Sequence, residues 1–518
     1  MGFKPEVQGV RSPHSSLRRS GRSHGEGGDR DVYCTKETDT GHAGSGKSLP
    51  TSLYEISKKA GRDKFSRFGN LYTLLNKEAL VYAIGELNPK AAAGVDGITY
   101  EEYVQDAEAH AERLVMKLKN KSYRAKLVRR QYIPKLNGKL RPLGIPAIDD
   151  KVLQLACARI LEAIFDPNFY EHSYGYRRGL GAHDAVNELK LTLQFKPVRY
   201  VVEADIKGFF DNLDHDYLLK MIEQRVDDKA FIKLIRKWLK AGVLEKAGEI
   251  VHPVSGTPQG GIISPILANI YLDHALDKWF QKVVKANCDA RNTYCNMVRY
   301  ADDFVCVFYS RDCAQEFYEC LQKRLGKFKL DVEPTKTKLL LFSKYSVKES
   351  GSFTFLSFDF FMDTNTKGKP QVKLVSSKKK LLNSIQEFKK WAKESKSTCI
   401  TKLMKTLKRK YQGYYNYYAV PMNGKRLNYY YKATQEILYK WLNRRSHRKS
   451  YNWKGFNELM KYFEIPPPKI TVFGRRRQRT GPCQGAGPKS GRCSARPSCP
   501  RGEYARHFRP RPPFCEGG

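Results

Sequence analysis

Two aspartates stand side by side in the stretch MVRYADDFVCVF, residues 297–308, with an apolar run on each side of the pair. If MVRY and DFVCVF are the two strands of a hairpin, Ala301 and Asp302 lie at its tip, where Asp302 and Asp303 can approach one spot. Two carboxylates roughly 4 Å apart repel each other by about 4 kcal/mol at an effective dielectric of about 20, which favours a bound cation. Taken alone, such a pair is more often a solvated polar turn.

A third carboxylate follows a second predicted strand. The segment VVEADIKGFFDNLDHDYL, residues 201–218, begins as an apolar strand, delivers Asp205 at the end of that strand and then becomes helical. Two strand ends that each deliver a carboxylate are what a two-metal site for phosphoryl transfer requires, with hard Mg²⁺ ions bridging carboxylate and phosphate oxygens. This second acidic strand end makes a site for two Mg²⁺ ions the favoured interpretation of the aspartate pair.

The segments around these carboxylates predict a mixture of helices and strands. Apolar residues recur at helical spacing in KVLQLACARILEAIF (151–165) and SPILANIYLDHALDKWF (264–280), whereas VRYVVEADI (198–206) is β-rich and FTFLSFDFF (353–361) alternates like a strand. Because the helices and strands do not follow a regular βαβ repeat, the predicted fold class is α+β. From about Ser377 the spacing is helical only, which indicates a separate basic helical domain.

The chain carries a large excess of positive charge. Its 518 residues include 93 Lys and Arg against 53 Asp and Glu, a formal net charge of +40 that is spread along most of the sequence. This charge indicates an extended polyanion as the partner, with nucleic acid as the first candidate and a merely basic, ribosome-associated protein as the alternative. The sequence has no long apolar stretch and no export signal, so we expect no membrane contact and a cytoplasmic, nucleic-acid-associated location.

The two ends of the chain differ in composition from its body. Residues 1–50 are rich in Gly, Ser and charge, and residues 466–518 are rich in Gly, Pro, Arg and Ser, so both are expected to be disordered. The stretch GHAGSGKS (41–48) fits a phosphate-binding loop, but no apolar strand precedes it and Pro50 follows, so we predict no nucleotide site there. None of the 12 cysteines forms a CxxC pair, which argues against zinc.

Further motifs occur in a fixed order around the carboxylates. GTPQGGIISPILANIYLD (256–273) lies between ADIKGFFD and RYADD, and LDVEPTKTKLLLF (330–342) and FTFLSF follow the aspartate pair. The stretches AAAGVDGITYEEY, YIPKLNGKLRPLGIPAIDDKVLQ and HSYGYRRGLGAHDAV precede Asp205. In this order the motifs resemble those of reverse transcriptases, in particular the reverse transcriptases encoded by group II introns. The last motif departs from the FLGF that is usual in that family, because Ser357 stands in place of Gly.

The resemblance implies a fold and a function. It implies a right-hand polymerase fold with fingers and palm in residues 51–365 and an all-helical thumb and maturase domain in 366–465. Many members of that family continue into a zinc-dependent HNH endonuclease, but the disordered basic tail, residues 466–518, has no CxxC pair and is of low complexity, so we expect no HNH endonuclease. It implies an RNA-directed DNA polymerase, a nucleotidyltransferase that binds its group II intron RNA, assists its splicing and copies it into cDNA for intron mobility. The implied partners are intron RNA, an RNA template with a DNA primer, dNTPs and target DNA, in a bacterial cytoplasm. A splicing cofactor with residual polymerase activity is one alternative, and a retron or diversity-generating reverse transcriptase is another.

Individual residues match positions that have roles in that family. Asp205, Asp302 and Asp303 match the catalytic carboxylates and metal ligands, with Asp303 expected in a supporting role. Phe210 matches the bulky ring that lies against the sugar of the incoming nucleotide, although it could also be a core residue. The residues that match nucleotide-binding positions are Lys135, Arg141, Phe210, Gln259, Gly260 and Lys336.

Aromatic residues alternate with Arg and Lys in the helical region. Aromatic rings that stack on unpaired bases, together with cations that neutralise phosphates, are typical of RNA-binding surfaces. A helical thumb with incidental tyrosines is the alternative interpretation. The predicted RNA-binding residues are Tyr411, Tyr414, Tyr415, Arg444, Arg445 and Trp453.

Overall fold

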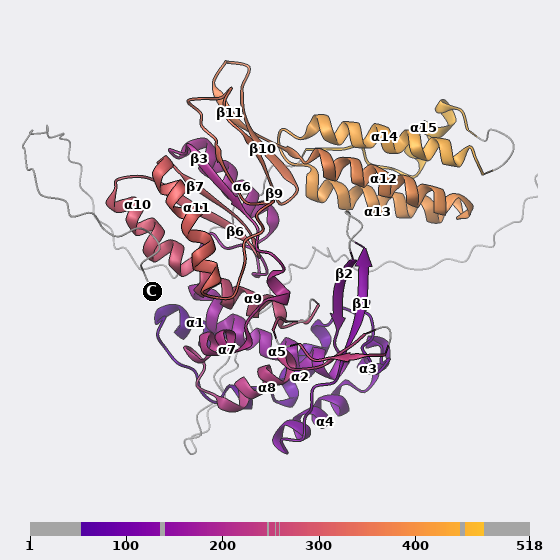
Figure 1. Ribbon diagram of the computed structural model, residues 1–518. Helices are drawn as coiled ribbons and strands as arrows, with labels where there is room; N and C mark the ends of the chain where they lie inside the picture. The colour runs from indigo at the N-terminus through magenta and orange to yellow at the C-terminus, as the bar shows by residue number, and fades with distance from the viewer. Residues whose placement is uncertain are drawn as a thin grey trace, which may run out of the picture. The chain divides into compact units, whose positions relative to one another are not determined.

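The computed structural model of the chain describes residues 53–134, 140–245, 248–253, 255–257, 260–445 and 451–470 (Figure 1). The expected leader, the stretch GHAGSGKS and nearly all of the expected tail lie outside these residues. Two of the predicted nucleotide-binding residues, Lys135 and Gln259, also lie outside them.

The described residues form a mixed set of helices and strands, which confirms the predicted α+β class. The α-helices are α1 (Leu53–Arg62), α2 (Lys77–Glu86), α3 (Tyr100–Gln105), α4 (Ala107–Lys119), α5 (Ile148–Phe165), α6 (Ala182–Phe195), α7 (His215–Glu223), α8 (Lys229–Leu239), α9 (Ser264–Leu272), α10 (Ala286–Ala290), α11 (Arg311–Gly326), α12 (Lys378–Glu394), α13 (Ile400–Tyr418), α14 (Gly424–Leu442) and α15 (Trp453–Tyr462). The strands are β1 (Val128–Pro134), β2 (Leu140–Ile145), β3 (Tyr200–Ala204), β4 (Val243–Leu244), β5 (Ile250–Val251), β6 (Cys295–Tyr300), β7 (Asp303–Phe308), β8 (Lys338–Leu341), β9 (Ser352–Phe355), β10 (Phe358–Thr364) and β11 (Pro370–Ser376). Short 3-10 and π-helical turns are η1 (Leu71–Leu74), η2 (Asp166–Asn168), η3 (Phe209–Asp211), η4 (Asp273–Asp277), η5 (Phe280–Lys285) and η6 (Ser395–Ser397).

The strands that carry the predicted carboxylates form one antiparallel sheet with the order β6–β7–β3–β8 (Figure 1). Along β7, Phe304 and Phe308 enter one apolar core, whereas Val305 and Val307 enter another. Helix α11 packs against β3, β7 and β8, and α6 packs against β6. Because both faces of this sheet are covered, the sequence after Asp303 is continuously apolar instead of alternating.

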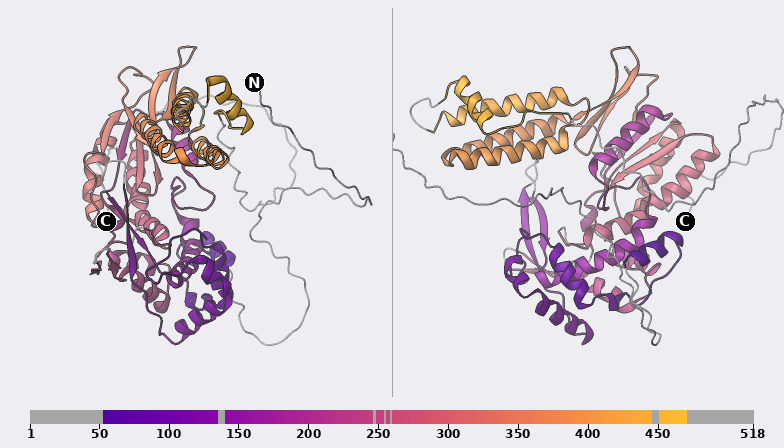
Figure 2. Two further views of the ribbon diagram at one scale, coloured as in Figure 1. Left: turned by 90° about the vertical axis from the view of Figure 1, so that its right-hand side faces the viewer. Right: turned by 180° about the vertical axis from the view of Figure 1, so that it is seen from behind.

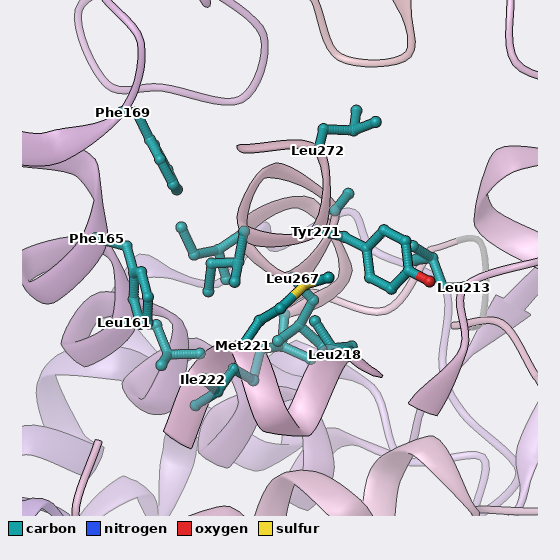
Figure 3. Close-up of a cluster of buried hydrophobic side chains, with 14 of the residues drawn as sticks. Leu161, Phe165, Phe169, Leu213, Leu218, Met221, Ile222, Leu267, Tyr271 and Leu272 are labelled. Atoms are coloured by element: carbon teal, nitrogen blue, oxygen red, sulfur yellow. The ribbon is translucent and has the colours of Figure 1, made fainter. Parts of the chain in front are cut away.

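The larger of these cores extends into the helices α5, α7 and α9 (Figure 3). Leu161 and Phe165 of α5 and Met221 of α7 are buried with Leu267 and Tyr271 of α9. Helix α5 is buried along nearly all of its length. The buried residues include polar ones in its first two turns.

Two smaller sheets complete the β-structure. The first has the order β2–β1–β4–β5, and its β1–β2 hairpin places Arg141 opposite Ile133. The second has the order β11–β10–β9. The expected domain boundary at residue 366 falls within the β10–β11 hairpin, and the helices begin at Lys378.

The segment FTFLSFDFF forms two strands, so the prediction of one continuous strand is wrong. Strands β9 and β10 pair with Phe355 opposite Phe358, which leaves Leu356 and Ser357 as a two-residue turn. Both turn residues have a left-handed backbone, with φ of 47° and 69°. A turn of this kind usually carries Gly, Asn or Asp. Neither residue gives that signal, so the sequence alternates through the turn without a break.

The described residues beyond Ser377 are helical, as their spacing predicts. Helices α12, α13 and α14 lie side by side (Figure 2) and share a core that includes Leu407, Tyr411 and Tyr430. Tyr417 of α13 donates a hydrogen bond to the Leu356 carbonyl at 2.9 Å, which ties these helices to the β9–β10 turn. No described helix combines the length and apolar character that a membrane crossing needs.

Substitutions at Ser357 should separate backbone strain from a hydrogen bond. The Ser357 hydroxyl bonds to the hydroxyl of Tyr418, and its left-handed backbone costs about 1–2 kcal/mol in any residue but Gly. We expect Ser357→Ala to lower the free energy of unfolding by about 1 kcal/mol, because it loses the bond and keeps the strain. Ser357→Gly loses the same bond but releases the strain, so it should be more stable than Ser357→Ala. Urea denaturation measures this order, and an alanine variant as stable as the glycine variant would contradict it.

Candidate active site

Two strand ends place aspartates at one edge of the central sheet. Strands β3 and β7 run antiparallel with Ala204 opposite Phe304. Asp205, the residue after β3, therefore comes next to Asp303, the first residue of β7. These two carboxyl groups share a hydrogen bond.

The β6–β7 hairpin supplies the third carboxylate. Tyr300 pairs with Asp303, which leaves Ala301 and Asp302 as the turn, and Ala301 has a φ of 57°. The hairpin and its tip are confirmed as predicted. The turn suspends the usual alternation of side chains, so both aspartates reach the same end of the sheet.

Loss of water and mutual repulsion raise the pKa of two of these aspartates. Asp303 remains accessible to solvent, but the protein around it removes much of its water. Together with the charges of Asp302 and Asp205, this raises the pKa of Asp303 to about 7. Loss of water is also the main cause that raises the pKa of Asp302, and the charge of Asp205 adds to it. The cluster of Asp205, Asp302 and Asp303 therefore carries more negative charge than its surroundings neutralise.

Cationic side chains lie beside this cluster. The Lys336 ammonium donates a hydrogen bond to Asp205 Oδ2 at 2.5 Å, and this bond raises the pKa of Lys336. The charge of Arg141 on β2 opposes the rise in the pKa of Asp302. Lys336 and Arg141 thus add positive charge at the site where the carboxylates gather.

The carboxylates fit a hard divalent cation, although they do not complete its coordination. Within the described residues, no three or more His, Cys, Asp or Glu side chains are arranged to hold a metal ion by themselves. In phosphoryl-transfer sites Mg²⁺ is usually held by one or two carboxylates together with substrate phosphates and water. Asp205, Asp302 and Asp303 can supply the carboxylate share of such a site.

A buried polar network holds the turn at Ala301. Arg299 is fully buried and forms a two-bond ion pair with Asp277, at 2.8 and 2.5 Å. Its remaining nitrogen donates to the Ala301 carbonyl at 2.9 Å and to Asn269 Oδ1 at 3.1 Å. Because a buried charge needs a fixed partner, this pairing also fixes the position of the turn that carries Asp302.

A second segment packs tightly on the same turn. The Asn269 amide donates to the Gly175 carbonyl at 2.9 Å, and the Tyr174 backbone amide donates to the Arg299 carbonyl at 2.8 Å. A Cβ atom on Gly175 would lie 2.2 Å from the backbone nitrogen of Ala301. Residue 175 therefore has to be Gly, because any side chain would displace the turn.

None of these supporting residues was among the predicted site residues. Asn269 and Asp277 are polar residues within the apolar helical stretch SPILANIYLDHALDKWF, which was a signal that buried partners exist. Arg299, by contrast, looks like any of the many basic residues of the chain. Only the structure pairs it with Asp277.

Phe210, five residues after Asp205 in the sequence, is largely buried. It belongs to η3, is 9% exposed, and its ring meets the ring of Tyr176 edge-on with centroids 6.4 Å apart. Its carbonyl accepts a hydrogen bond from the Thr257 amide at 2.8 Å. Most of this residue is therefore packed in the core, and only a small part of it is left for the predicted contact with a nucleotide sugar.

Gly260 brings a loop against the strand that carries Arg141. It has a φ of 114°, and a Cβ atom there would lie 2.7 Å from the Gly144 carbonyl of β2. Residue 260 therefore has to be Gly, because any side chain would meet the backbone of β2.

The structure divides the predicted RNA-binding residues into buried and accessible ones. Tyr411 and Tyr415 are 0% and 7% exposed in the core of the helical region, so neither ring can stack on RNA in this fold. Tyr414 is half-buried and stacks on Tyr430 with centroids 3.7 Å apart. Spacing was the missed signal, since Leu407, Tyr411 and Tyr415 recur every four residues on one helix face.

The other three candidates lie nearer to solvent. Arg445 donates to the carbonyls of Ser395 and Thr398 and thus holds the start of α13. Arg444 is exposed and lies over the Trp441 ring. Trp453 is 47% exposed and stacks on Tyr439 with centroids 4.2 Å apart. Arg444 and Trp453 thus remain accessible candidates.

Residues 133–360 match the family model described as reverse transcriptase (RNA-dependent DNA polymerase). Protein YkfC of Escherichia coli K12 is 33% identical over 276 residues, which cover 48% of this chain and 71% of YkfC. The chain belongs to the reverse transcriptase family. The group II intron-encoded protein LtrA of Lactococcus lactis subsp. cremoris is 41% identical over 229 residues, 44% of this chain and 38% of LtrA. Nuclear intron maturase 3 of Arabidopsis thaliana is 30% identical over 139 residues, 27% of this chain and 19% of that protein.

These relatives place this reverse transcriptase with the group II intron reverse transcriptases and maturases. It spans less than two fifths of the length of LtrA. The region that matches the family model contains all of the predicted catalytic and nucleotide-binding residues and none of the predicted RNA-binding residues.

Proposed function

We propose that this reverse transcriptase copies RNA into DNA, binds a group II intron RNA and assists its splicing. The observation that supports the polymerase activity is the convergence of Asp205, Asp302 and Asp303, from two strand ends, at one edge of the central sheet. This convergence lies within the region that matches the family. The relatives named as an intron-encoded protein and an intron maturase support the role in splicing.

The proposed reaction joins the 3′-hydroxyl of a primer to the α-phosphate of a dNTP and releases pyrophosphate. Asp205 and Asp302 would hold two Mg²⁺ ions, which when bound lower the pKa of the primer hydroxyl and neutralise the leaving group. Asp303 supports these ligands through its hydrogen bond with Asp205. The Lys336 ammonium, protonated beside Asp205, would donate a proton to the pyrophosphate.

The same proposal assigns nucleotide binding to the residues around the carboxylates. Arg141 and Lys135 would bind the triphosphate, since Arg141 belongs to β2, Lys135 directly follows β1 in the sequence, and guanidinium groups bind phosphates with two bonds. Phe210 would exclude a 2′-hydroxyl. Gln259 would contact the nucleotide, and Gly260, which has no side chain, would let the backbone approach it.

RNA binding is assigned to the basic surface and to the helical region, which would act as thumb and maturase domain. A net charge of +40 favours phosphate backbones, and the exposed Trp453 and Arg444 offer a ring and a guanidinium plane for unpaired bases. Copying of the intron for mobility would add target DNA as a partner.

Primer extension tests the polymerase. Purified protein, with an oligo(dT) primer on poly(rA), dTTP and Mg²⁺, should extend the primer. A chelator should stop extension, and added Mg²⁺ should restore it. A protein that does not extend the primer yet promotes splicing of its intron RNA would favour a splicing cofactor over a polymerase.

Replacing Trp453 with Ala should weaken binding of intron RNA by about tenfold, because stacking of one base on an aromatic ring contributes about 1–3 kcal/mol. Tyr54 in α1, which is 63% exposed, provides a matched control outside the helical region. Tyr54→Ala should leave RNA affinity unchanged. Filter binding at a fixed salt concentration measures both, and equal affinities of the two variants would remove Trp453 from the proposed surface.

A further inference from the structure

Tyr176 lies in the motif HSYGYRRGLGAHDAV, but the sequence assigned it no role at the site. It follows Gly175, the residue that packs on the Ala301 turn. Its side chain is 45% exposed, although its ring meets the buried ring of Phe210 edge-on, with an interplanar angle of 77°. The ring thus has one edge against Phe210 and another part open to solvent.

The backbone at Tyr176 is strained. Its φ is 58°, in the left-handed region that is unusual for a bulky side chain. Such strain persists only where the surroundings hold the chain, and it is concentrated at functional sites. Here the residues on both sides are held. Tyr174 and Gly175 bond to Arg299 and Asn269, and Arg177 donates to the Ser173 carbonyl at 2.8 Å.

The hydroxyl of Tyr176 lies in the field of the catalytic candidates. Burial and the charges of Asp302 and Asp303 raise its pKa, whereas Arg141 acts in the opposite direction. The phenol therefore stays protonated and can donate a hydrogen bond. None of the described residues forms a hydrogen bond with this hydroxyl.

Packing alone does not account for a strained, partly exposed ring. A core aromatic residue would be buried, and a surface tyrosine would need no left-handed backbone. The position of Tyr176, between Phe210 and the charges of Asp302 and Arg141, is where the sugar and phosphates of a bound nucleotide would meet protein.

We propose that Tyr176 is a specificity-determining residue that forms, with Phe210, a two-ring wall against the sugar of the incoming deoxynucleoside triphosphate. The inference rests on the proposed polymerase function. The ring restricts the space beside the sugar, and the hydroxyl donates to a sugar or phosphate oxygen. Phe210 therefore shares the exclusion of ribonucleotides with Tyr176.

Steady-state primer extension with Tyr176→Gly and Tyr176→Phe tests this proposal. Glycine accepts the left-handed backbone, so Tyr176→Gly removes the ring without adding strain. We expect Tyr176→Gly to raise the KM for dNTP and to lower the preference for dNTP over rNTP, each by about tenfold. The KM for template–primer and the melting temperature of Tyr176→Gly should stay at their wild-type values. Tyr176→Phe should keep the preference and raise only the KM for dNTP.

Tyr345→Gly is the matched control, because Tyr345 is 64% exposed and contacts Arg199 rather than the site. The inference is overturned if the wild-type protein extends primers and Tyr176→Gly keeps both the wild-type KM for dNTP and the wild-type preference for dNTP over rNTP. That result would leave the proposed function intact. A rise in the KM for template–primer alone would also overturn it, since the ring would then contact the template. Wild-type protein that does not extend primers would contradict the proposed function itself.

Discussion

Replacing Asp302 with Asn should abolish primer extension, with a fall in kcat of about a thousandfold or more. The amide keeps the size of the carboxylate but removes its charge. Preorganised charges at sites of phosphoryl transfer typically contribute on this scale. Asp302 lies in the turn of the β6–β7 hairpin, where no other side chain of the turn can replace it. Single-turnover extension on an RNA template measures the effect.

The same variant should be more stable than the wild-type protein in metal-free buffer. The pKa of Asp302 is raised in the folded state, so its ionised form is destabilising at any pH above the pKa in the unfolded chain, about 3.9. The gain in melting temperature should therefore be largest at neutral pH and above, and should shrink as the pH falls toward 4. Loss of activity together with a gain in stability distinguishes a functional carboxylate from a structural one.

Asp216→Asn is the control for this prediction. Asp216 lies on α7 with a side chain that is 77% exposed, and its contact with Arg236 is 3.6 Å long. The variant should keep wild-type extension and stability, because exposed ion pairs contribute little. An Asp302→Asn protein that retained a tenth or more of the wild-type rate would exclude Asp302 as a metal ligand.

Replacing Arg299 with Met should lower the free energy of unfolding by about 3–5 kcal/mol, because it leaves Asp277 buried without its partner. The variant also loses the hydrogen bond to the Ala301 carbonyl. The turn that carries Asp302 then lacks a support, so kcat should fall as well. Urea denaturation and primer extension measure the two effects separately.

The double variant Arg299→Met with Asp277→Leu separates stability from positioning. Removing both charges should restore most of the lost stability, since apolar pairs often replace buried ion pairs without loss. The rate should stay low, because the donor to Ala301 is still absent. Full recovery of the rate in the double variant would show that Arg299 acts on folding alone. Arg311→Met, an exposed position at the start of α11, serves as the control.

Much of the fold follows from local patterns in the sequence. The helices at 148–165 and from Lys378 onward, the strand before Asp205 and the hairpin around Asp302 all occur where periodicity predicts them. These elements were predictable because the residues that form each of them are neighbours in the sequence. The β9–β10 hairpin was not, because Leu356 and Ser357 adopt left-handed backbones without the residue types that usually mark them.

Such local patterns do not predict contacts between segments that are distant in the sequence. Nothing in the sequence pairs Asp277 with Arg299, and Tyr411 and Tyr415 look like stacking residues. The structure buries all four, because a side chain's environment depends on what the other segments bring to it.

The sequence by itself therefore determined which carboxylates come together, since strand ends and ordered motifs select Asp205, Asp302 and Asp303. Only the tertiary structure decided how they are held. It pairs Arg299 with Asp277, sets Gly175 against the Ala301 backbone and turns the strained ring of Tyr176 toward Phe210. The physical reason is that a metal-binding carboxylate is specified by its own chemistry, whereas a supporting residue is specified only by its neighbours in space.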